Sequence, residues 1–286
     1  MLSTNITVCI FAWNEEQRLR RCIDNFRGRL PMMVVDNQST DRTCAVATEE
    51  GVRAIVVKNP GFIETPEVMN VVLAECTTDY VLIASVSEYV PLALLSVYAD
   101  IANRARYDVV RAYRASITAG HAIAISGRPS AGDPGQLRFF RKGSISYEDN
   151  HVHGLGKPSV APDRVLSVVT QQQHHFYQFR DYDCARTEQV LCRYDDVLAE
   201  QRHAAGQRFR MRRAIWRSCA AFCNCYFRFG AFRFGMLGFL HSYYRFHMEF
   251  STWLRVWERE NNLTLTDVKR HNEAVRAGME TADSNL

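Results

Sequence analysis

The chain has 286 residues, of which 47% are hydrophobic and 23% are charged. These proportions allow one large domain, or a domain with an appendage, and they exclude a chain that is disordered throughout. The net charge of +4 is modest but unevenly distributed, because residues 206–259 contain ten arginines, no lysine and only two acids, Glu249 and Glu258. We therefore expect a local basic surface late in the chain.

The cysteines and the N-terminal residues indicate the compartment. Nine cysteines are scattered without the spacing of a disulfide framework. The first residues carry no charged segment before an apolar run, so no signal peptide is expected. No window offers about 18 uncharged apolar residues, and a transmembrane helix is not expected either. The sequence predicts free thiols and a cytoplasmic location.

Strand-like and helix-like segments alternate through the first hundred residues. The expected strands are 6–11, 32–35, 52–57, 80–84 and 108–113, and the expected helices are 15–26, 39–50, 66–76 and 91–104. Strands that alternate with helices of this length predict an α/β fold with a mostly parallel sheet and right-handed crossovers.

The pattern changes in the second half of the chain. Residues 115–135 are rich in Gly, Ser and Pro and predict a loop or flap, whereas 137–141 and 144–147 predict short strands. From about Asp183 the chain reads as helical almost to its end. The sequence thus predicts an α/β domain over 1–182 and a helical extension over 183–286.

Polar residues follow three of the predicted strands, in the segments 12–15, 36–41 and 85–88. In an open parallel sheet the carboxyl ends of the strands line one crevice. Asp36 ends a buried strand, where a carboxylate can accept hydrogen bonds from a base or a ribose. Asp41 is expected to complement the dipole of a helix that Ser39 or Thr40 caps.

The order of these segments resembles the family 2 glycosyltransferases. The stretches CIFAWNEE (9–16) and VVDNQSTDRT (34–43) correspond to the family's Asn-Glu pair and its V-D-x-x-S-T-D-x-T signature. Asn70 falls where the family commonly carries an asparagine. The resemblance covers about the first 95 residues and implies a GT-A fold and a nucleotide-sugar donor.

The same resemblance assigns roles to the nucleotide pocket. It implies that Asp36 contacts the base, while Ala12, Asn14 and Glu15 line the nucleotide. An alternative for Asn14 and Glu15 is that they cap the first helix.

Ser85 and Ser87 stand where the family usually carries the two aspartates of Asp-x-Asp, which hold Mg²⁺ or Mn²⁺ against the donor diphosphate, and Glu88 remains where a glutamate often follows. A serine hydroxyl is a poor ligand for a hard divalent ion without carboxylates nearby. Three interpretations stay open: Glu88 binds the ion with a distant histidine, the site works without metal through arginines and hydroxyls, or it is catalytically inactive. Glu88 as a charge at a helix N-terminus is a structural alternative.

Residues 137–154 resemble a segment of bacterial members that build lipopolysaccharide or capsule, although Gly154 replaces a frequent glutamate. The resemblance implies that His153 completes the metal and diphosphate site, with Arg138 or Arg141 near the phosphates. The alternative is that His153 is a solvated loop residue.

Inversion at the anomeric carbon requires a general base aimed at the acceptor hydroxyl. Glu148 and Asp149 are the available carboxylates beside the predicted histidine. Asp149 is preferred, although sequence alone does not separate two adjacent acids.

The helical end interleaves arginine with aromatic residues, with fifteen aromatics in residues 206–259. Basic amphipathic helices of this composition lie in the interface of anionic membranes. A packed helical subdomain or a homodimer face is the alternative, and no nucleic-acid motif supports nucleic-acid binding.

Together these features predict an inverting glycosyltransferase. It would move a sugar from a nucleotide-diphosphate donor to a surface-glycan acceptor of lipopolysaccharide or capsule type, glycan or lipid-linked, at the cytoplasmic face of the inner membrane. The alternative is a non-catalytic nucleotide-sugar binder or scaffold of a glycan-assembly complex.

Overall fold

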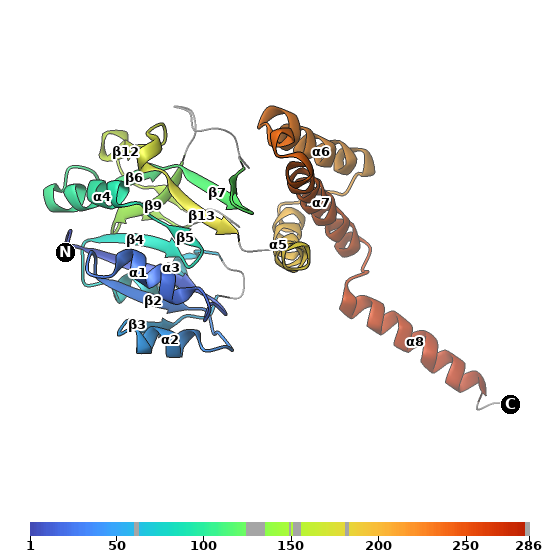
Figure 1. Ribbon diagram of the computed structural model, residues 1–286. Helices are drawn as coiled ribbons and strands as arrows, with labels where there is room; N and C mark the ends of the chain where they lie inside the picture. Colours follow the sequence, from blue (N-terminus) through green and yellow to red (C-terminus); the bar gives the residue numbers. More distant parts are fainter. Residues whose placement is uncertain (60–62, 124–134, 149, 151–155, 181–182, 284–286) are drawn as a thin grey trace. The chain divides into compact units, whose positions relative to one another are not determined.

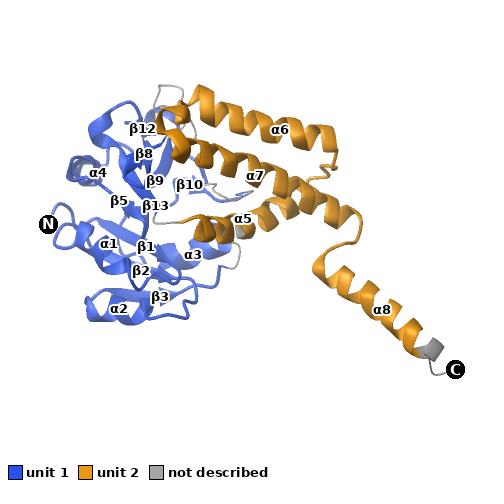
Figure 2. Ribbon diagram, turned by 45° about the vertical axis from the view of Figure 1, so that its right-hand side comes forward, with its two compact units in different colours: residues 1–181 blue, residues 182–286 orange. Residues whose placement is uncertain are grey.

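The computed structural model describes residues 1–59, 63–123, 135–148, 150, 156–180 and 183–283. The chain divides into two compact units, Met1–Asp181 and Tyr182–Leu286 (Figure 2). The predicted assignment of a transferase domain to 1–182 and of a membrane-associating extension to 183–286 concerns function, and it stays a prediction.

A seven-stranded sheet forms the centre of the first unit, as far as this unit is described, with the order β12-β6-β9-β4-β1-β2-β3 (Figure 1). The strands are β1 (Ile6–Ala12), β2 (Met32–Asp36), β3 (Arg53–Val56), β4 (Tyr80–Ser85), β6 (Val109–Ala112), β9 (Gln136–Arg141) and β12 (Val165–Ser167). Every neighbouring pair is parallel except those of β9, which runs antiparallel to both β4 and β6. The predicted mostly parallel sheet is confirmed, with one reversed strand inside it.

Helices cover both faces of this sheet because its strands are apolar on both sides. Side chains alternate between the faces of a strand, so Val8 and Ile10 of β1 join one buried cluster while Cys9 joins the other. The first cluster packs against α1 (Leu19–Phe26), α2 (Thr43–Glu49) and α4 (Leu92–Arg104), and the second against α3 (Pro66–Ala74). The result is a three-layered α/β arrangement.

The first unit also contains a smaller, four-stranded sheet, with the order β5-β13-β7-β8. Its strands are β5 (Glu88–Tyr89), β13 (Phe176–Arg180), β7 (Arg114–Thr118) and β8 (His121–Ala122). The prediction of a continuous loop over 115–135 was therefore wrong at its start, since β7 and β8 form a hairpin there. Residues 124–134 of that stretch lie outside the described part of the chain.

Short elements complete the first unit. The strands β10 (Ile145–Ser146) and β11 (Lys157–Pro158) pair with each other, and single 3-10 turns cover Pro162–Arg164 and Gln172–His174.

The second unit is helical, as predicted. It contains α5 (Cys184–Ala204), α6 (Met211–Cys223), a π turn (Asn224–Arg228), a 3-10 turn (Ala231–Phe234), α7 (Gly235–Glu260) and α8 (Leu265–Asp283). A search of the described helices for a long apolar membrane-spanning stretch found none.

Trp253 of α7 forms the centre of this unit, fully buried against Ala199 of α5 and Ala214 of α6. Its indole nitrogen donates to Glu249, which also accepts hydrogen bonds from Arg202 and Arg217. Although burial raises the pKa of Glu249, these two arginines hold it below its ordinary value. One partly buried carboxylate thus joins α5, α6 and α7.

A close backbone contact fixes the start of α7. A Cβ atom added at Gly238 would lie 1.8 Å from the carbonyl oxygen of Ala231. Only glycine allows the 3-10 turn to approach the helix this closely.

Candidate functional site

The loops after β1 and β2 are joined by hydrogen bonds at the carboxyl edge of the sheet. The backbone N–H of Asn14 donates to the Ser39 hydroxyl at 2.8 Å, and the Asn14 side-chain oxygen accepts from the Thr40 N–H at 2.8 Å. The Glu16 N–H donates to the Asp41 carboxylate at 3.1 Å. The two polar segments identified in the sequence therefore form one structure.

These cross-loop bonds correct two expectations about the helices. Helix α2 begins at Thr43, its cap position is Arg42, and neither Ser39 nor Thr40 caps it. Asp41 instead accepts from Thr43 and from the neighbouring loop, and these hydrogen bonds outweigh burial and lower its pKa. Asp41 is thus a structural residue that joins the loops.

Helix α1 also begins later than expected, at Leu19. The carboxylate of Glu15 forms a bidentate ion pair with Arg18, at 2.6 and 2.7 Å. The backbone N–H of Glu15 donates to the Thr43 hydroxyl. Glu15 therefore stabilises the loop through both its side chain and its backbone.

Asp36 ends β2 next to Ala12 of β1, and its side chain is 1% exposed. One carboxylate oxygen, Oδ2, accepts from the Ser39 N–H at 2.9 Å. The other oxygen, Oδ1, has no hydrogen-bond partner among the described residues. Burial raises the pKa of the neighbouring Cys44 thiol, and the negative charge of Asp36 raises it further. A buried carboxylate oxygen without a partner is rare in folded proteins and favours a ligand-binding role.

The two loops also hold unusual backbone conformations. Asn14 and Gln38 have positive φ angles of 53° and 57°. Residues other than glycine rarely adopt this region, and such conformations cluster at binding sites. Both positions lie two residues after the ends of β1 and β2, where the ligand is expected.

The serines and the glutamate after β4 form a tight turn around a buried ion pair. The hydroxyls of Ser85 and Ser87 lie 3.2 Å apart, and the Ser85 N–H donates to Glu88 Oε2 at 2.9 Å. The other oxygen, Oε1, accepts from Arg138 at 2.8 Å and lies 4.0 Å from Arg114. The Glu88 side chain is only 1% exposed, so it is buried within the first unit.

Further polar groups surround Arg138. Its Nε atom is buried without a partner among the described residues, as is the hydroxyl of Tyr147. Burial raises the pKa of Glu64, and Arg138 acts in the opposite direction. Burial and then Glu64 raise the pKa of Tyr147. The charges of Glu64 and Arg138 thus influence one another, and both influence the Tyr147 hydroxyl.

Other predicted residues are not brought into this cluster. Arg141 pairs with Tyr80 at the beginning of β4, because β9 is antiparallel to it. It therefore lies roughly 16 Å along the strand from Ser85, at the amino edge of the sheet. Asn70 is exposed on α3, and Glu148 is exposed in its turn. Asp149 and His153 lie outside the described residues.

The Mg²⁺ or Mn²⁺ ion implied by the resemblance does not fit the residues that are described here. Both oxygens of Glu88 are engaged, by Arg138 and by a backbone N–H, and serine hydroxyls replace the two carboxylates. No group of three His, Cys, Asp or Glu side chains in the described part of the chain could hold an ion. A hard divalent cation requires such anionic oxygen ligands.

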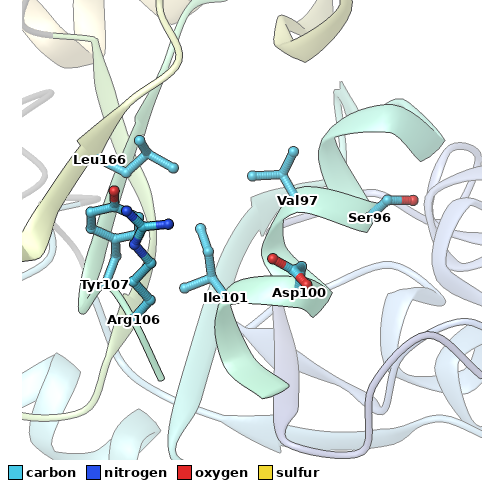
Figure 3. Close-up of a pocket in the computed structure, with 7 residues that line it drawn as sticks. All are labelled: Ser96, Val97, Asp100, Ile101, Arg106, Tyr107 and Leu166. Carbon is cyan, nitrogen blue, oxygen red and sulfur yellow. The ribbon is translucent and has the colours of Figure 1, made fainter. Parts of the chain in front are cut away.

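A cavity with a volume of about 330 Å³ lies elsewhere in the first unit. It lies between α4 and the beginning of β6, and Leu166 and Ile101 line it with Asp100, Arg106 and Tyr107 (Figure 3). Arg106 stacks on the Tyr107 ring at 5.2 Å, and Asp100 pairs with Arg104. The Asp100 carboxylate is thus already paired, and the cavity lies at the edge opposite the loops described above.

Sequence reasoning missed Arg114 and Glu64. Neither belongs to a recognisable motif, since Arg114 precedes a stretch expected to be a loop and Glu64 precedes α3. An arginine at the start of a short β-branched segment is too weak a signal to single out.

Comparisons with known proteins agree with the fold. Residues 7–125, less than half of the 286, match the family model described as glycosyl transferase family 2. No curated protein matches.

Several solved structures are similar. Staphylococcus aureus TarS is 13% identical with a TM-score of 0.45, covering 69% of this chain and 42% of TarS. TarS 1–349 in complex with UDP-GlcNAc has 13% identity and a TM-score of 0.45, covering 92% and 93%. Mycobacterium tuberculosis glucosyl-3-phosphoglycerate synthase with Mn²⁺, UDP-glucose and phosphoglyceric acid has 20% identity and a TM-score of 0.32, covering 39% and 44%.

The chain spans less than half the length of the first of these structures. The match over residues 7–125 confirms the resemblance seen in the sequence: this part of the first unit is similar to glycosyl transferase family 2.

Proposed function

We propose that the protein transfers a sugar from a nucleotide-diphosphate donor. The main support for this proposal is Asp36, whose buried carboxylate lies at the end of a strand. One of its oxygens has no hydrogen-bond partner among the described residues. Asp36 lies within the segment that matches glycosyl transferase family 2. In this proposal Asp36 receives the base, and the joined loops that contain Ala12 and Asn14 shape the nucleoside pocket.

The reaction we propose is an inverting single displacement. The carboxylate of Glu148 or Asp149 takes the proton of the acceptor hydroxyl as that oxygen bonds to the anomeric carbon. The bond to the donor phosphate breaks, and its electron pair leaves with the nucleoside diphosphate. The exposure of Glu148 supports access to an acceptor, and Asp149 is the second candidate.

The acceptor we propose is a surface glycan of lipopolysaccharide or capsule type, reached at an anionic membrane surface. The second unit supports this with exposed apolar side chains, which include Trp216 at 73%, Phe227 at 63% and Met236 at 76%. Exposed arginines Arg212 and Arg233 lie in the same segment. Aromatic residues with a basic surround favour the interface of anionic bilayers.

The donor pocket is tested by nucleotide binding. We expect Asp36→Asn to weaken nucleoside binding about tenfold or more, because a charge-assisted hydrogen bond to the base is lost. Isothermal titration with uridine, guanosine, thymidine and their diphosphates measures this. Asp24→Asn, an exposed residue that pairs with Arg27, is the matched control. Unchanged affinity in Asp36→Asn would refute the pocket.

Turnover separates an enzyme from a non-catalytic binder. Radiolabelled UDP-, GDP- and dTDP-sugars are incubated with the protein and a lipid extract, and released nucleotide is measured. Release that depends on Asp36 supports the transferase, whereas tight nucleotide binding without release supports the scaffold alternative.

Binding of the protein to a membrane surface is tested by co-sedimentation with lipid vesicles. The double variant Trp216→Ser/Met236→Ser should bind vesicles rich in phosphatidylglycerol several times more weakly, since about 25 cal/mol is lost per Å² of apolar area that no longer inserts. Met279→Ser, an exposed apolar position on α8, is the control. Equal binding of both variants would contradict membrane docking through this surface.

A further inference from the structure

Two thiols are in contact inside the first unit. Cys9 in β1 and Cys76, two residues after the end of α3, have their Sγ atoms 3.5 Å apart, although 67 positions separate them in the chain. Both cysteines are free, and they are 0% and 3% exposed. The sulfur atoms of a disulfide lie about 2.05 Å apart, so these two would have to approach each other by about 1.5 Å to form one.

Hydrogen bonds give the two thiols different roles. Cys76 donates to the carbonyl oxygen of Val72 at 3.3 Å, which leaves Cys9 as the donor in the contact between the sulfur atoms. The ammonium group of Lys142 lies beside the same residue, because it donates to the Cys76 carbonyl oxygen at 2.7 Å. A thiolate on Cys76 is thus stabilised by a hydrogen bond and by a nearby positive charge.

The acidities of the two thiols differ accordingly. The hydrogen bond from Cys9 lowers the pKa of Cys76 against the effect of burial, and the charge of Lys142 lowers it further. The contact with Cys76, together with burial, raises the pKa of Cys9. By comparison, burial raises the pKa of the Cys22 thiol to about 12. The pair therefore combines one nucleophilic sulfur with one that keeps its proton, and thiol–disulfide chemistry uses this asymmetry.

The two cysteines also differ in how firmly the fold holds them. Cys9 pairs with Met33 and Ile83 on the neighbouring strands of the sheet. Cys76 belongs to the connection between α3 and β4, where the next residue, Thr77, is exposed. A connection of this kind can open locally while the sheet stays folded. A small uncharged oxidant therefore reaches Cys76 before Cys9.

We propose that Cys9 and Cys76 are a modification site, at which a peroxide forms a disulfide that stabilises the first unit. The Cys76 thiolate attacks one oxygen of hydrogen peroxide, the O–O bond breaks and hydroxide leaves, so that Cys76 becomes a sulfenic acid. The Cys9 sulfur then attacks the Cys76 sulfur, the S–O bond breaks, and the oxygen leaves as water with the Cys9 proton. The two thiols lose two electrons and two protons, and one peroxide becomes two waters. This chemistry needs no nucleotide and does not depend on the proposed function.

The first experiment identifies the product in the full-length chain. The exposed cysteines of the second unit are replaced by serine, so that they do not consume the oxidant, and this variant is the parent of all others. They are Cys184, Cys192, Cys219 and Cys223. The parent is treated with hydrogen peroxide, unfolded in N-ethylmaleimide, digested and analysed by mass spectrometry. We expect a linked Cys9–Cys76 peptide pair in most molecules and an alkylated Cys22. Alkylation of Cys9 and Cys76 as complete as that of Cys22 would overturn the inference.

Single variants of the parent test the order of the two steps. In Cys9→Ser the introduced hydroxyl can still donate to Cys76, which should stop at the sulfenic acid and react with dimedone. The parent should show several times less dimedone on Cys76, because Cys9 removes the sulfenic acid. In Cys76→Ser the Cys9 thiol should stay reduced, and Cys22→Ser is the control that keeps the linked pair. Equal dimedone labelling of Cys9 in Cys76→Ser and of Cys76 in Cys9→Ser would overturn the assignment of the nucleophile.

Thermal unfolding measures what the bond does to the fold. A disulfide between residues 67 positions apart restricts the unfolded chain. The oxidised parent should therefore unfold about 5 °C or more above its reduced form, and dithiothreitol should reverse the shift. Cys9→Ser and Cys76→Ser should show no such shift after peroxide treatment, and their reduced forms show whether each variant is folded. An oxidised parent that unfolds at or below the temperature of its reduced form would overturn the stabilising role of the bond.

Discussion

The two edges of the central sheet each bury a carboxylate against arginine, and they differ in what remains unpaired. At the carboxyl edge Glu88 accepts from Arg138 at 2.8 Å. At the amino edge both oxygens of Asp108 accept from Arg164, at 2.7 and 2.8 Å. Each carboxylate also has a second arginine about one ångström further away, at 4.0 and 3.9 Å.

The surroundings of the two pairs distinguish their roles. Among the described residues, buried polar atoms without a partner include those of Asp36, Arg138 and Tyr147, and none belongs to Asp108 or Arg164. A fully satisfied ion pair is a structural device, whereas buried polar groups without a partner are rare and favour a ligand-binding role. An ion pair by itself is therefore a poor guide to function.

The largest expected effect is on stability at the carboxyl edge. Glu88→Leu should lower the free energy of unfolding by about 3–5 kcal/mol, because Arg138 stays buried without its counter-charge. Glu88→Leu/Arg138→Met should recover most of this loss. Urea unfolding of both variants measures the coupling, and equal losses in the single and double variants would contradict the pairing.

The pair at the amino edge should affect stability alone. Asp108→Asn should lower the free energy of unfolding by about 1.5–3 kcal/mol at neutral pH and leave nucleotide affinity unchanged. Hydrogen bonding to Arg164 holds the pKa of Asp108 below its ordinary value. The stability it adds is therefore present above its ordinary pKa of about 3.9 and is lost as pH falls through the lower folded value.

Urea unfolding from pH 7 down to pH 2 tests this assignment. The loss of stability in acid should be shallower in Asp108→Asn than in the wild type. A parallel acid profile, or weakened nucleotide binding in the variant, would show that the two edges are not separate in function.

The smallest expected effect is a change in the free energy of unfolding at two positions with a strained backbone. Gln38 at the carboxyl edge and Ala105 at the amino edge have φ angles of 57° and 51°. Replacing either with glycine relieves the left-handed strain and should raise the free energy of unfolding by up to about 1 kcal/mol. Thermal unfolding checks this, and destabilisation by Gln38→Gly alone would show that its side chain supports the site.

Most of the fold could be predicted from the sequence because local patterns determine it. The apolar runs that predict β1, β2 and β4 agree with the observed strands to within one residue. The starts of α1 and α2 were missed because residues Asn14 and Asp41 bond across loops, and a single segment does not reveal such partners.

The candidate site was predicted less completely. Asp36 was identified by its place at a strand end, and the nucleotide contact assigned to it stays a prediction. Arg141 was grouped with Arg138, because the sequence does not show that β9 runs antiparallel and carries the two residues toward opposite edges. Arg114 has no local signal, since it approaches Glu88 only through the second sheet.

The reversed strand β9 has a consequence for the order of folding. It lies between β4 and β6 although residues 136–141 follow both of them along the chain. Until this late segment inserts, the growing sheet has an open gap, and Glu88 has no Arg138 to neutralise it. Assembly of the turn around Glu88 is thereby tied to one of the last long-range pairings of the domain, and such pairings form slowly. A half-folded chain is therefore unable to complete the Glu88–Arg138 ion pair before its core has closed.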